Sequence, residues 1–463
     1  MTLLAFFLDN APVIQPSSAN PPMPGTLAPG RVTDALSERI TAMHWLVVII
    51  ASCGWLFDCM DQRLFILARE SALKELLGAA AAAAEVKTHA GYATTAMILG
   101  WATGGIFFGM MSDKWGRVKT MVVTLLVYSG FTGLSGVATS WVDFTAYRFL
   151  VGLGVGGMFG AATTLVAASV PSRVRAIALG ALQALSALGN IMGSLISLQI
   201  QPGATNLLWG YSGWRLLFFV GIIPSLLVVP IMFVLKEPEA WRRAKAEAAQ
   251  GIVKKNIGSP LELFRSPRWR RNSIVGLMLG VSGMIGLWGI GFYSPELIST
   301  ALVGAPQHTI DTVRGWGTAL QDVGSFLGML TFTVIASVLS RRLAFFFAFL
   351  AGMLTTAFVF HSLHTAADAY WMLPMMGFAQ LALFAGYSIY FPELFPTRLR
   401  GTGVGFCYNT VRYLAAPAPI LLGYLSTVLS FRTAAVLMSS VYLVGMVALI
   451  WAPETKGQPL PED

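Results

Sequence analysis

The sequence has few charged residues and few residues of the kinds that bind metals or form disulfides. Only 11% of its 463 residues are charged, whereas 55% are hydrophobic. A chain with so little polar surface cannot cover a soluble globule, so the composition predicts a protein with many membrane spans. Its 3 cysteines and 5 histidines lack the spacing of a disulfide framework or a metal site. We therefore expect no metal and no cofactor.

Two further kinds of site are missing from the sequence. There is no Gly-rich phosphate loop with its lysine, which argues against ATP-driven pumping, and no constellation of catalytic residues, which argues against an enzyme. The net charge is +9, but Lys and Arg are not gathered into one basic domain, so we expect no nucleic-acid partner. The informative charges are therefore those inside apolar segments and in short loops.

Apolar runs long enough to cross a bilayer occur twelve times, as six, a hydrophilic stretch and six more. We expect an all-α membrane protein with six-helix bundles at 41–235 and 273–452, joined by a cytoplasmic linker at 236–272. Residues 1–40 are expected to form a disordered cytoplasmic tail, and residues 453–463 a second cytoplasmic tail. Lys and Arg concentrate in alternate loops, which predicts cytoplasmic termini in the cell (inner or plasma) membrane.

The first span, 45–68, contains charges near its middle. The segment GWLFDCMDQRLF carries Asp58, Asp61 and Arg63. Ionisable groups at this depth usually face the protein interior or a water-filled path, and a spacing of three places the two Asp on one face. Arg63 points elsewhere, near the helix end, where its side chain can reach the membrane interface. We interpret the Asp residues as proton or substrate groups; the alternative is a fixed ion pair that only sets helix packing.

The chain contains an internal repeat. VPSRVRAIALG at 170–180 recurs as FPTRLRGTGVG at 395–405, and each copy lies between the fourth and fifth spans of its half. Parallel six-span repeats are the architecture of major facilitator transporters, whose substrate site lies near the bilayer midplane between the halves. The repeat therefore predicts two pseudo-symmetric bundles.

The segment GMMSDKWGRVK at 109–119 resembles the signature loop of the major facilitator superfamily. Gly109 and Gly116 allow close helix approach and a tight turn. Asp113 and Arg117 can form charge-assisted bonds that lock an inner gate and break when it opens. The alternative is a positive-inside signal without a gating role.

The fourth span carries Arg148 and several glycines in YRFLVGLGVGGMFG. No strand precedes these glycines, so close helix packing explains them better than dinucleotide binding. Arg148 resembles the arginine that pairs with an acid of the first span in proton-linked sugar porters and organic acid symporters. Asp61 or Asp58 would be that acid, and proton uptake would release the pair; the alternative is a permanent ion pair.

PELFPTRLRG at 392–401 and PETKG at 453–457 resemble loop motifs of sugar porters and organic ion transporters. The resemblance implies a network of charges at the cytoplasmic gate. With the matching residues of the first repeat copy, its expected members are Arg173, Arg175, Glu393, Arg398, Arg400, Glu454 and Lys456.

Arg412 lies within the eleventh span, 402–425. Its spacing after RLRG resembles that of an arginine in organic anion transporters that contacts anionic substrates, and its fork suits a carboxylate. The alternative is a packing arginine paired with Asp322 or a carbonyl group. The other residues expected to bind substrate are Gln183, Asn190, Trp288, Tyr293, Gln321, Asp322, Tyr387 and Asn409.

These resemblances imply a secondary transporter that takes up a small organic acid or related metabolite with protons, by alternating access. Its partners would be that substrate, protons and the lipid bilayer, and it would work as a monomer. The fifth span lacks the Gly-Pro pair of the drug antiporters of the superfamily, which argues against efflux. A sugar porter or uniporter shares the Arg148, FPTRLRG and PETKG features and stays open as an alternative.

Overall fold

The computed structural model describes residues 41–78, 83–249, 258–415, 417–418, 421–422, 425 and 428–462. The tail expected at 1–40 lies outside these described residues, and so does segment 250–257 of the expected linker. All of the described residues belong to one compact unit, Ile40–Asp463.

The first half contains five long helices: α3 (Ala42–Leu77), α4 (Ala83–Trp115), α5 (Arg117–Ser135), α6 (Trp141–Ser169) and α7 (Ser172–Ile200). Its sixth span is divided into α8 (Gly213–Val220), the 3-10 turn Ile223–Leu227 and α9 (Val228–Val234). Pro224 lies at the start of that turn, where a missing N–H and a fixed φ break the helical bonding.

Two short helices, α10 (Glu239–Ala249) and α11 (Pro260–Arg265), lead into the second half. Its first span runs through α12 (Pro267–Met284), the π-helical turn Ile285–Ile290, the 3-10 turn Gly291–Tyr293 and α13 (Ser294–Ala301). The others are α14 (Gln307–Val338), α15 (Arg341–Ser362), α16 (Ala366–Glu393) and α17 (Arg400–Ala415), then α19 (Phe431–Met438), the 3-10 turn Ser439–Val441 and α20 (Tyr442–Ala448).

Several helices begin at a serine whose hydroxyl accepts a backbone N–H of the first turn. Ser140 accepts from Asp143 N at 3.1 Å before α6, and Ser340 accepts from Leu343 N at 3.0 Å before α15. Such caps satisfy donors that the helix itself leaves free. Gly116, between α4 and α5, has a φ of 119°, so the tight turn expected there does require glycine.

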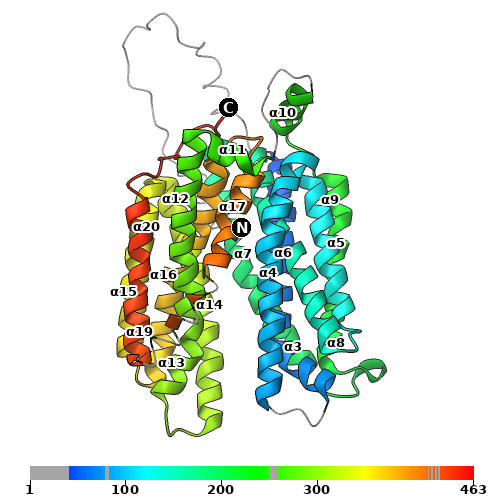
Figure 1. Ribbon diagram of the computed structural model, residues 1–463, viewed down its shortest axis with the longest axis vertical. Coiled ribbons are helices and arrows are strands. Elements are labelled where there is room, and N and C mark those ends of the chain that lie inside the picture. Colours follow the sequence, from blue (N-terminus) through cyan, green and yellow to red (C-terminus); the bar gives the residue numbers. More distant parts are fainter. Residues whose placement is uncertain are drawn as a thin grey trace, which may run out of the picture. The chain divides into compact units, whose positions relative to one another are not determined.

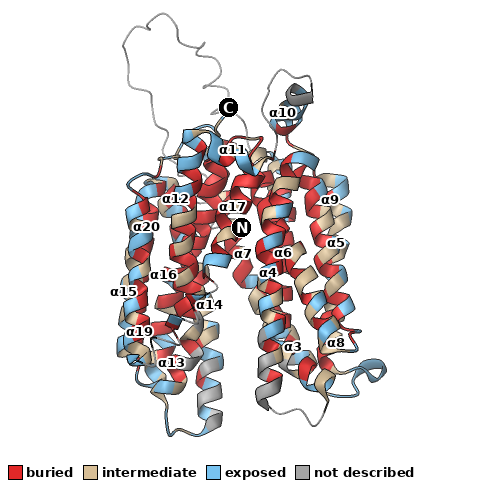
Figure 2. Ribbon diagram, viewed as in Figure 1, coloured by how far each residue is buried: buried red, intermediate tan, exposed pale blue. Residues whose placement is uncertain are grey.

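In the part of the chain that the structure describes, eleven segments are long and apolar enough to cross a membrane. The remaining expected span, 402–425, is described continuously only to Ala415, as α17. Large apolar side chains such as Phe233, which is 83% exposed, face outward from the helices. Figure 2 shows the buried residues between the helices and many exposed ones on the outer sides of α5, α9 and α15, as expected for surfaces in contact with lipid.

The two halves lie side by side, and α4 packs against α17 while α7 packs against α14 and α16 (Figure 1). The two copies of the repeat make the same bond. Arg175 Nε donates to Ala167 O at 2.9 Å, and Arg400 Nε donates to Pro392 O at 3.1 Å, each eight residues back along the chain. The repeated sequence therefore folds into a repeated structure.

One end of the helices carries Asp113, and the opposite end carries Glu75. Glu75 connects α3 to the start of α8: its carboxylate accepts from the hydroxyl of Ser212, the N-cap residue, from Trp214 Nε1 at 2.8 Å and from Arg215 Nε at 3.1 Å. Partial burial raises the pKa of Glu75, but the bonds from these three residues outweigh burial and lower that pKa below its ordinary value.

Because this pKa is lowered, we expect the stability that the Glu75 hydrogen bonds contribute to be lost at acidic pH. Stability from Glu75 is present above the pKa of the unfolded chain, about 4.5, and is lost as the pH falls through the lower folded pKa. We expect Glu75→Gln to lower the thermal unfolding temperature near neutral pH, and the difference from wild type to shrink as the pH is lowered towards about 3. Thermal unfolding across this range checks it; a difference that does not change with pH would contradict it.

Candidate functional site

The two aspartates of α3 lie in the interior of the first half. Asp58 and Asp61 are both 0% exposed, and no described residue hydrogen-bonds to their carboxylate oxygens. Asp58 is sixteen residues into α3, about 24 Å along the helix axis, which is deep in the span. An ionised carboxylate without a partner is costly in such surroundings, so these groups are suited to taking up a proton or meeting a mobile charge.

Arg148, from α6, is buried beside this pair but is held by neutral groups. Its Nε donates to Ser135 Oγ at 3.1 Å, and its guanidinium lies 4.7 Å from the ring centre of Phe218. Asp61 is the acidic residue whose charge favours the charged form of Arg148, but the two side chains form no ion pair within 4 Å. The close pair expected between Arg148 and an acid of the first span is therefore not formed in this conformation. Rings of aromatic residues and a hydroxyl hold the arginine instead.

A polar stripe on α5 completes the buried cluster, and sequence reasoning missed it. Thr124, Tyr128, Thr132 and Ser135 are all 0% exposed. The hydroxyls of Tyr128 and Thr132 have no hydrogen-bond partner in the described part of the protein. A Cβ added to Gly221 would lie 2.3 Å from Thr132 Cγ2 and 2.9 Å from Asp61 Oδ1, so the stripe lies beside Asp61. Polar residues spaced three or four apart in a single apolar span are the signal that could have found this stripe.

Arg412 lies where the two halves meet. Twelve residues along α17 from Arg400, about 18 Å, its guanidinium is 3.9 Å from the ring centre of Trp101 in α4. Nη1 donates to Tyr408 O at 2.7 Å and to Asn409 Oδ1 at 2.8 Å, whereas Nε is buried without a partner among the described residues. Asn409 therefore orients Arg412. Asp58 in the first half and Arg412 in the second half are thus a buried acid and a buried cation, one from each half.

Aromatic rings surround this junction. Trp101 meets Trp288 edge to face at 6.3 Å, and Tyr408 stacks on Phe159 of the first half at 4.0 Å. Trp288 lies in the π-helical turn after α12, a local distortion that often marks functional positions. Gln183 of α7 is 3% exposed and its Oε1 has no partner among the described residues. The aromatic rings and Arg412 thus form the contact between the two halves at this point.

Two other residues expected at the substrate site, Tyr387 and Tyr293, pack within the second half, whereas a substrate role for the side chains of Asn190 and Gln321 stays a prediction. Tyr387 is fully buried, donates its hydroxyl to Leu279 O at 2.7 Å and stacks on Phe391, so it is a packing residue. Tyr293 packs beside Phe431 at the core of the second half. Asn190 and Gln321 are half-buried, and each accepts a serine hydroxyl at its backbone oxygen, from Ser194 and Ser325.

Arg63 corrects a second expectation. Its side chain does not reach towards the membrane interface; instead Nη2 donates to Asp322 Oδ2 of α14 at 2.8 Å, across the two halves. This contact also removes Asp322 as the partner considered for Arg412. The side chains of Arg63 and Asp322 are 25% and 26% exposed, and Arg63 Nε is buried without a hydrogen bond to a described residue. Arg63 and Asp322 thus form a partly solvated tie between the halves.

Asp113 joins the two halves at its end of the protein. Its carboxylate accepts from Gly401 N at 2.9 Å, Thr402 N at 2.8 Å and Thr402 Oγ1 at 2.9 Å, all at the start of α17. The first N–H groups of a helix have no partner within it, so Asp113 caps α17 from the opposite half. A Cβ on Gly109 would lie 2.6 Å from Gly401 O, which confirms that the helices approach too closely for a larger residue.

Arg117 supports this contact. Its Nη2 donates to Thr397 O at 2.7 Å and lies 3.5 Å from Asp113 Oδ1. Sequence reasoning missed two supporting residues that follow the sixth span. Glu237 accepts Arg117 N at 2.8 Å and so caps α5, and Trp241 Nε1 donates to Asp113 O at 2.6 Å. A glutamate and a tryptophan just after a span are too common to have singled these out.

A second network lies within the other half. Arg341 binds Glu393 through Nε at 3.1 Å and Nη2 at 3.0 Å, while Glu454 accepts the N–H groups of Arg341 and Arg342. Partial burial raises the pKa of Glu454, but the N–H groups of Lys456, Arg341 and Arg342 lower it below its ordinary value. Glu393 and Glu454 thus meet in one network through Arg341, which was not among its expected members.

The remaining residues of the expected gate behave differently. Arg398 pairs with Glu262 at 3.6 Å, whereas Arg400 is fully buried with both Nη atoms lacking described partners. Arg175 is buried on the Ala167 carbonyl. Arg173 is exposed, and no ion pair of it is found within the described ranges, so the structure does not bring it into the network as predicted.

We expect Asp113→Asn to favour separation of the halves at this end, because each bond to a charged group contributes about 1.5–3 kcal/mol. Spin labels at the exposed residues Lys119 and Arg342 would report the change as a longer distance population. Asp368→Asn, which removes a carboxylate at the start of α16, is the matched control and should leave that distance unchanged. Equal distances in wild type and Asp113→Asn would contradict the gating role.

Two helical bundles that meet around buried charges form the architecture of a secondary transporter, in which the two halves rock about a central site. The sequence profile of the Major Facilitator Superfamily matches residues 50–418. The chain belongs to this superfamily, and it is a transporter rather than an enzyme.

Known proteins with similar sequences are also transporters. The cis,cis-muconate transport protein of Acinetobacter baylyi is 28% identical over 80% of this chain and 87% of its own length. The probable 4-methylmuconolactone transporter of Cupriavidus pinatubonensis is 26% identical over 87% of this chain and 89% of its own. The structure of the proton:xylose symporter XylE matches with a TM-score of 0.72 at 18% identity, covering 90% of this chain and 98% of that one. The expected twelve-span major facilitator fold is thereby confirmed.

Proposed function

We propose that the protein is a proton-coupled symporter that takes up a small organic acid. The observation that carries this proposal is Arg412: a buried guanidinium at the meeting of the halves, stacked on Trp101 and Tyr408, with Nε unpartnered in the described structure. A carboxylate could bind that free edge through charge-assisted hydrogen bonds. The relatives named for cis,cis-muconate and 4-methylmuconolactone support a substrate of this class.

The coupling that we propose is electrostatic. In this proposal Arg412 is the cation that favours the ionised form of Asp58 while no substrate is bound. A substrate carboxylate bound to Arg412 neutralises that cation, and Asp58 then gains by taking up a proton. Carboxylate and proton would enter together, as a neutral pair, and the halves would then rock. The proton would reach and leave Asp58 along a buried polar path formed by Asp61, Arg148 and the stripe on α5.

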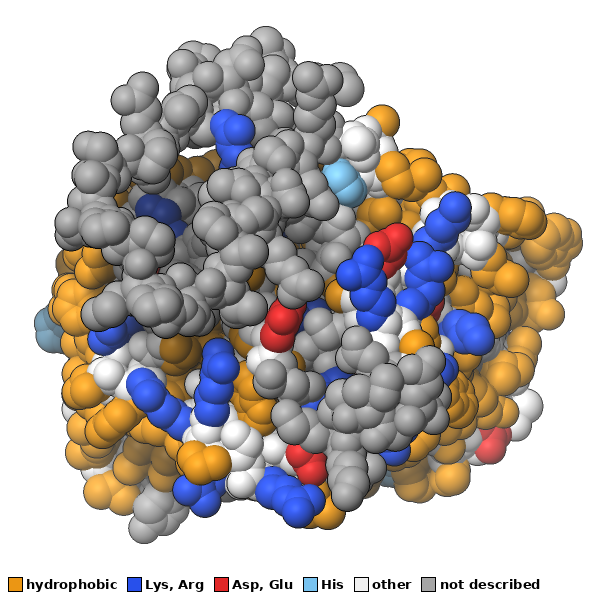
Figure 3. Space-filling model, turned by 90° about the horizontal axis from the view of Figure 1, so that it is seen from above, with side chains coloured by type: hydrophobic (Ala, Val, Ile, Leu, Met, Phe, Trp, Pro, Cys, Tyr) orange, Lys and Arg blue, Asp and Glu red, His pale blue; other side chains and the backbone are white. Residues whose placement is uncertain are grey.

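The proposed orientation places the Asp113 end in the cytoplasm and the Glu75 end outside, with the protein in the cell membrane as a monomer. Lys and Arg side chains are spread over the Asp113 end in Figure 3, in keeping with the positive-inside rule. The contacts of Asp113 and Arg117 close the cytoplasmic side in this conformation. It would therefore be a state ready to receive substrate from outside.

Arg63 and Asp322 are expected to respond to substrate. Asp322 binds Nη2 alone, so a second acceptor group of a substrate held on Arg412 could replace Asp322 and use Nε as well. We expect Asp322→Asn to strengthen the binding of a carboxylate several-fold and Arg63→Gln to weaken it, with binding measured by calorimetry on purified protein. If both variants weaken binding equally and the exchanged pair Arg63→Asp with Asp322→Arg restores it, the contact is only a structural tie.

Uptake by the purified protein in liposomes tests the proposal. With an inward proton gradient we expect 4-methylmuconolactone, which carries a single carboxylate, to accumulate and xylose to remain at equilibrium. The sugar porter is the second candidate, since XylE shares the fold. Accumulation of xylose with no uptake of any carboxylate would favour that candidate and contradict ours.

A further inference from the structure

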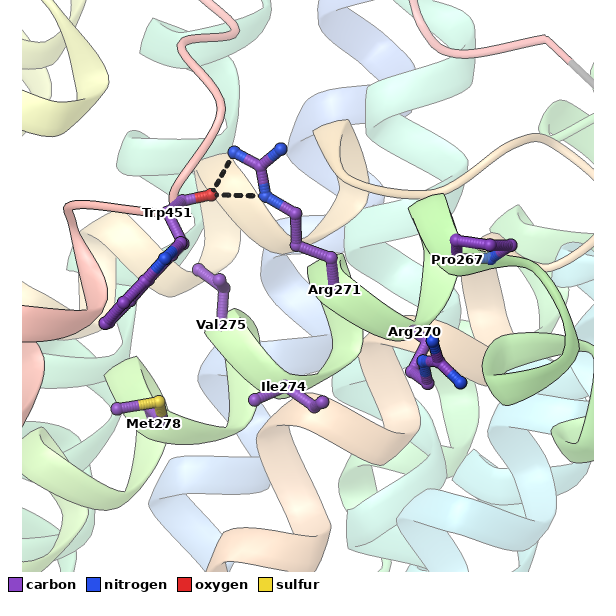
Figure 4. A pocket seen from close by; sticks show the side chains of 7 residues that line it. All are labelled: Pro267, Arg270, Arg271, Ile274, Val275, Met278 and Trp451. Carbon is purple, nitrogen blue, oxygen red and sulfur yellow. Dashed lines mark hydrogen bonds between the residues drawn. The ribbon is translucent and has the colours of Figure 1, made fainter.

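A groove at the Asp113 end is separate from the residues proposed for transport. It lies between the start of α12 and the chain that follows α20, and has a volume of about 260 Å³. Figure 4 shows its lining: Pro267, Arg270, Arg271, Ile274, Val275, Met278 and Trp451. We propose that this groove binds an anionic phospholipid of the membrane leaflet on the Asp113 side.

The polar rim of the groove suits a phosphate. Arg271 is held in place by Trp451 O, which accepts from its Nε at 2.9 Å and its Nη2 at 2.7 Å (Figure 4). Its Nη1 is not used in these bonds. Arg270 is exposed, and within the described ranges its side chain has no ion pair. Both arginines belong to the first turns of α12, where the helix dipole also favours a negative charge.

The floor of the groove suits an acyl chain. Ile274 is 48% exposed and Trp451 is 50% exposed, although both are strongly apolar, and they stand beside Met278 and the buried Val275. Tryptophan at a span end is typical of the level of the lipid headgroups. The arginines lie on the headgroup side of the groove and the apolar side chains lie further into the membrane. A phospholipid has its phosphate and its acyl chains in the same order, so it matches the groove better than a free phosphate does. Basic pockets between spanning helices are known to hold anionic headgroups.

A lipid bound in this groove would affect the structure nearby, because the groove adjoins the second charge network. The chain beyond Trp451 continues into the second charge network, where Pro453 O accepts the hydroxyl of Tyr390 at 2.6 Å and Glu454 binds the start of α15. A headgroup on Arg270 and Arg271 would thus hold α12 to the segment that binds this network. Anionic lipid would therefore stabilise the arrangement of the second half at this end.

Trp451 provides the probe for the experiment. The full-length protein is placed in vesicles with a small fraction of either phosphatidylglycerol or phosphatidylcholine carrying brominated acyl chains, which quench nearby tryptophans. The emission of Trp451 is taken as the difference between wild type and Trp451→Phe. We expect brominated phosphatidylglycerol to quench this emission at least about twice as strongly as brominated phosphatidylcholine.

Variants separate a defined site from general attraction. Arg270→Gln leaves the bonds between Arg271 and Trp451 in place and should remove the preference for phosphatidylglycerol. Arg268→Gln is the matched control, because Arg268 is two residues away, stacks on Trp269 and does not line the groove. Equal quenching by the two lipids, or an equal loss in both variants, would overturn the proposal. Inorganic phosphate at matched ionic strength should not restore the emission; if it does, a free anion occupies the rim.

Discussion

Asp58→Asn is expected to abolish the accumulation of carboxylate substrate while exchange of labelled for unlabelled substrate continues. The amide keeps the size of the side chain but cannot take up a proton, so substrate and proton are no longer linked. For a neutral pair of carboxylate and proton, a gradient of one pH unit supplies about 1.4 kcal/mol, which is about tenfold accumulation. Wild-type protein should reach this ratio in liposomes, and the variant should stay near one.

Asp61→Asn is the matched comparison for this prediction. Asp61 is as deeply buried as Asp58, but the opposing charge that acts on it is Arg148 rather than Arg412. We expect Asp61→Asn to slow transport and to leave the final accumulation ratio above that of Asp58→Asn. If Asp61→Asn removes accumulation and Asp58→Asn does not, the proton belongs to Asp61 and our assignment is wrong.

Arg412→Gln is expected to weaken the binding of a carboxylate substrate by about 10- to 100-fold, since bonds from a charged donor contribute about 1.5–3 kcal/mol. Arg412→Lys should restore part of the loss, because it keeps the charge without the planar fork. Calorimetric titration of purified protein measures both.

Two controls complete that test. Arg173→Gln removes one positive charge from an exposed site and should leave binding unchanged. The neutral amide of the same substrate should bind weakly to wild type and be insensitive to Arg412→Gln. If the carboxylate binds equally well to wild type and Arg412→Gln, Arg412 is a packing arginine and another residue holds the anion.

The features that the sequence predicted well are those set by local pattern. Apolar length predicts the spans, the loop at Asp113 predicts a contact with Arg117 that the structure shows, and the repeated sequence predicts that the two halves share local structure, as the bonds of Arg175 and Arg400 show. In these places one short segment contains both the charged side chain and the helix end near which it lies. A glycine that must approach another backbone, as Gly109 does, is visible in the sequence for the same reason.

Contacts between distant parts of the chain were not predictable in this way. Arg63 meets Asp322, 259 residues away, because the halves bring α3 and α14 together, and no local pattern specifies that partner. Arg148 was expected beside an acid and is held by a hydroxyl and rings, which depend on how α5 and α6 pack. Tyr387 is a polar aromatic residue of the kind that often lines a cavity, but it is fully buried in the core of the second half.

The most direct test of the proposed function is proton movement in liposomes that contain the purified protein, with no gradient imposed at the start. Adding an accepted carboxylate outside should make the external medium more alkaline as substrate enters, and the signal should vanish in Asp58→Asn while exchange continues. Carboxylate uptake without any change of external pH would contradict proton coupling, and the protein would then be a uniporter.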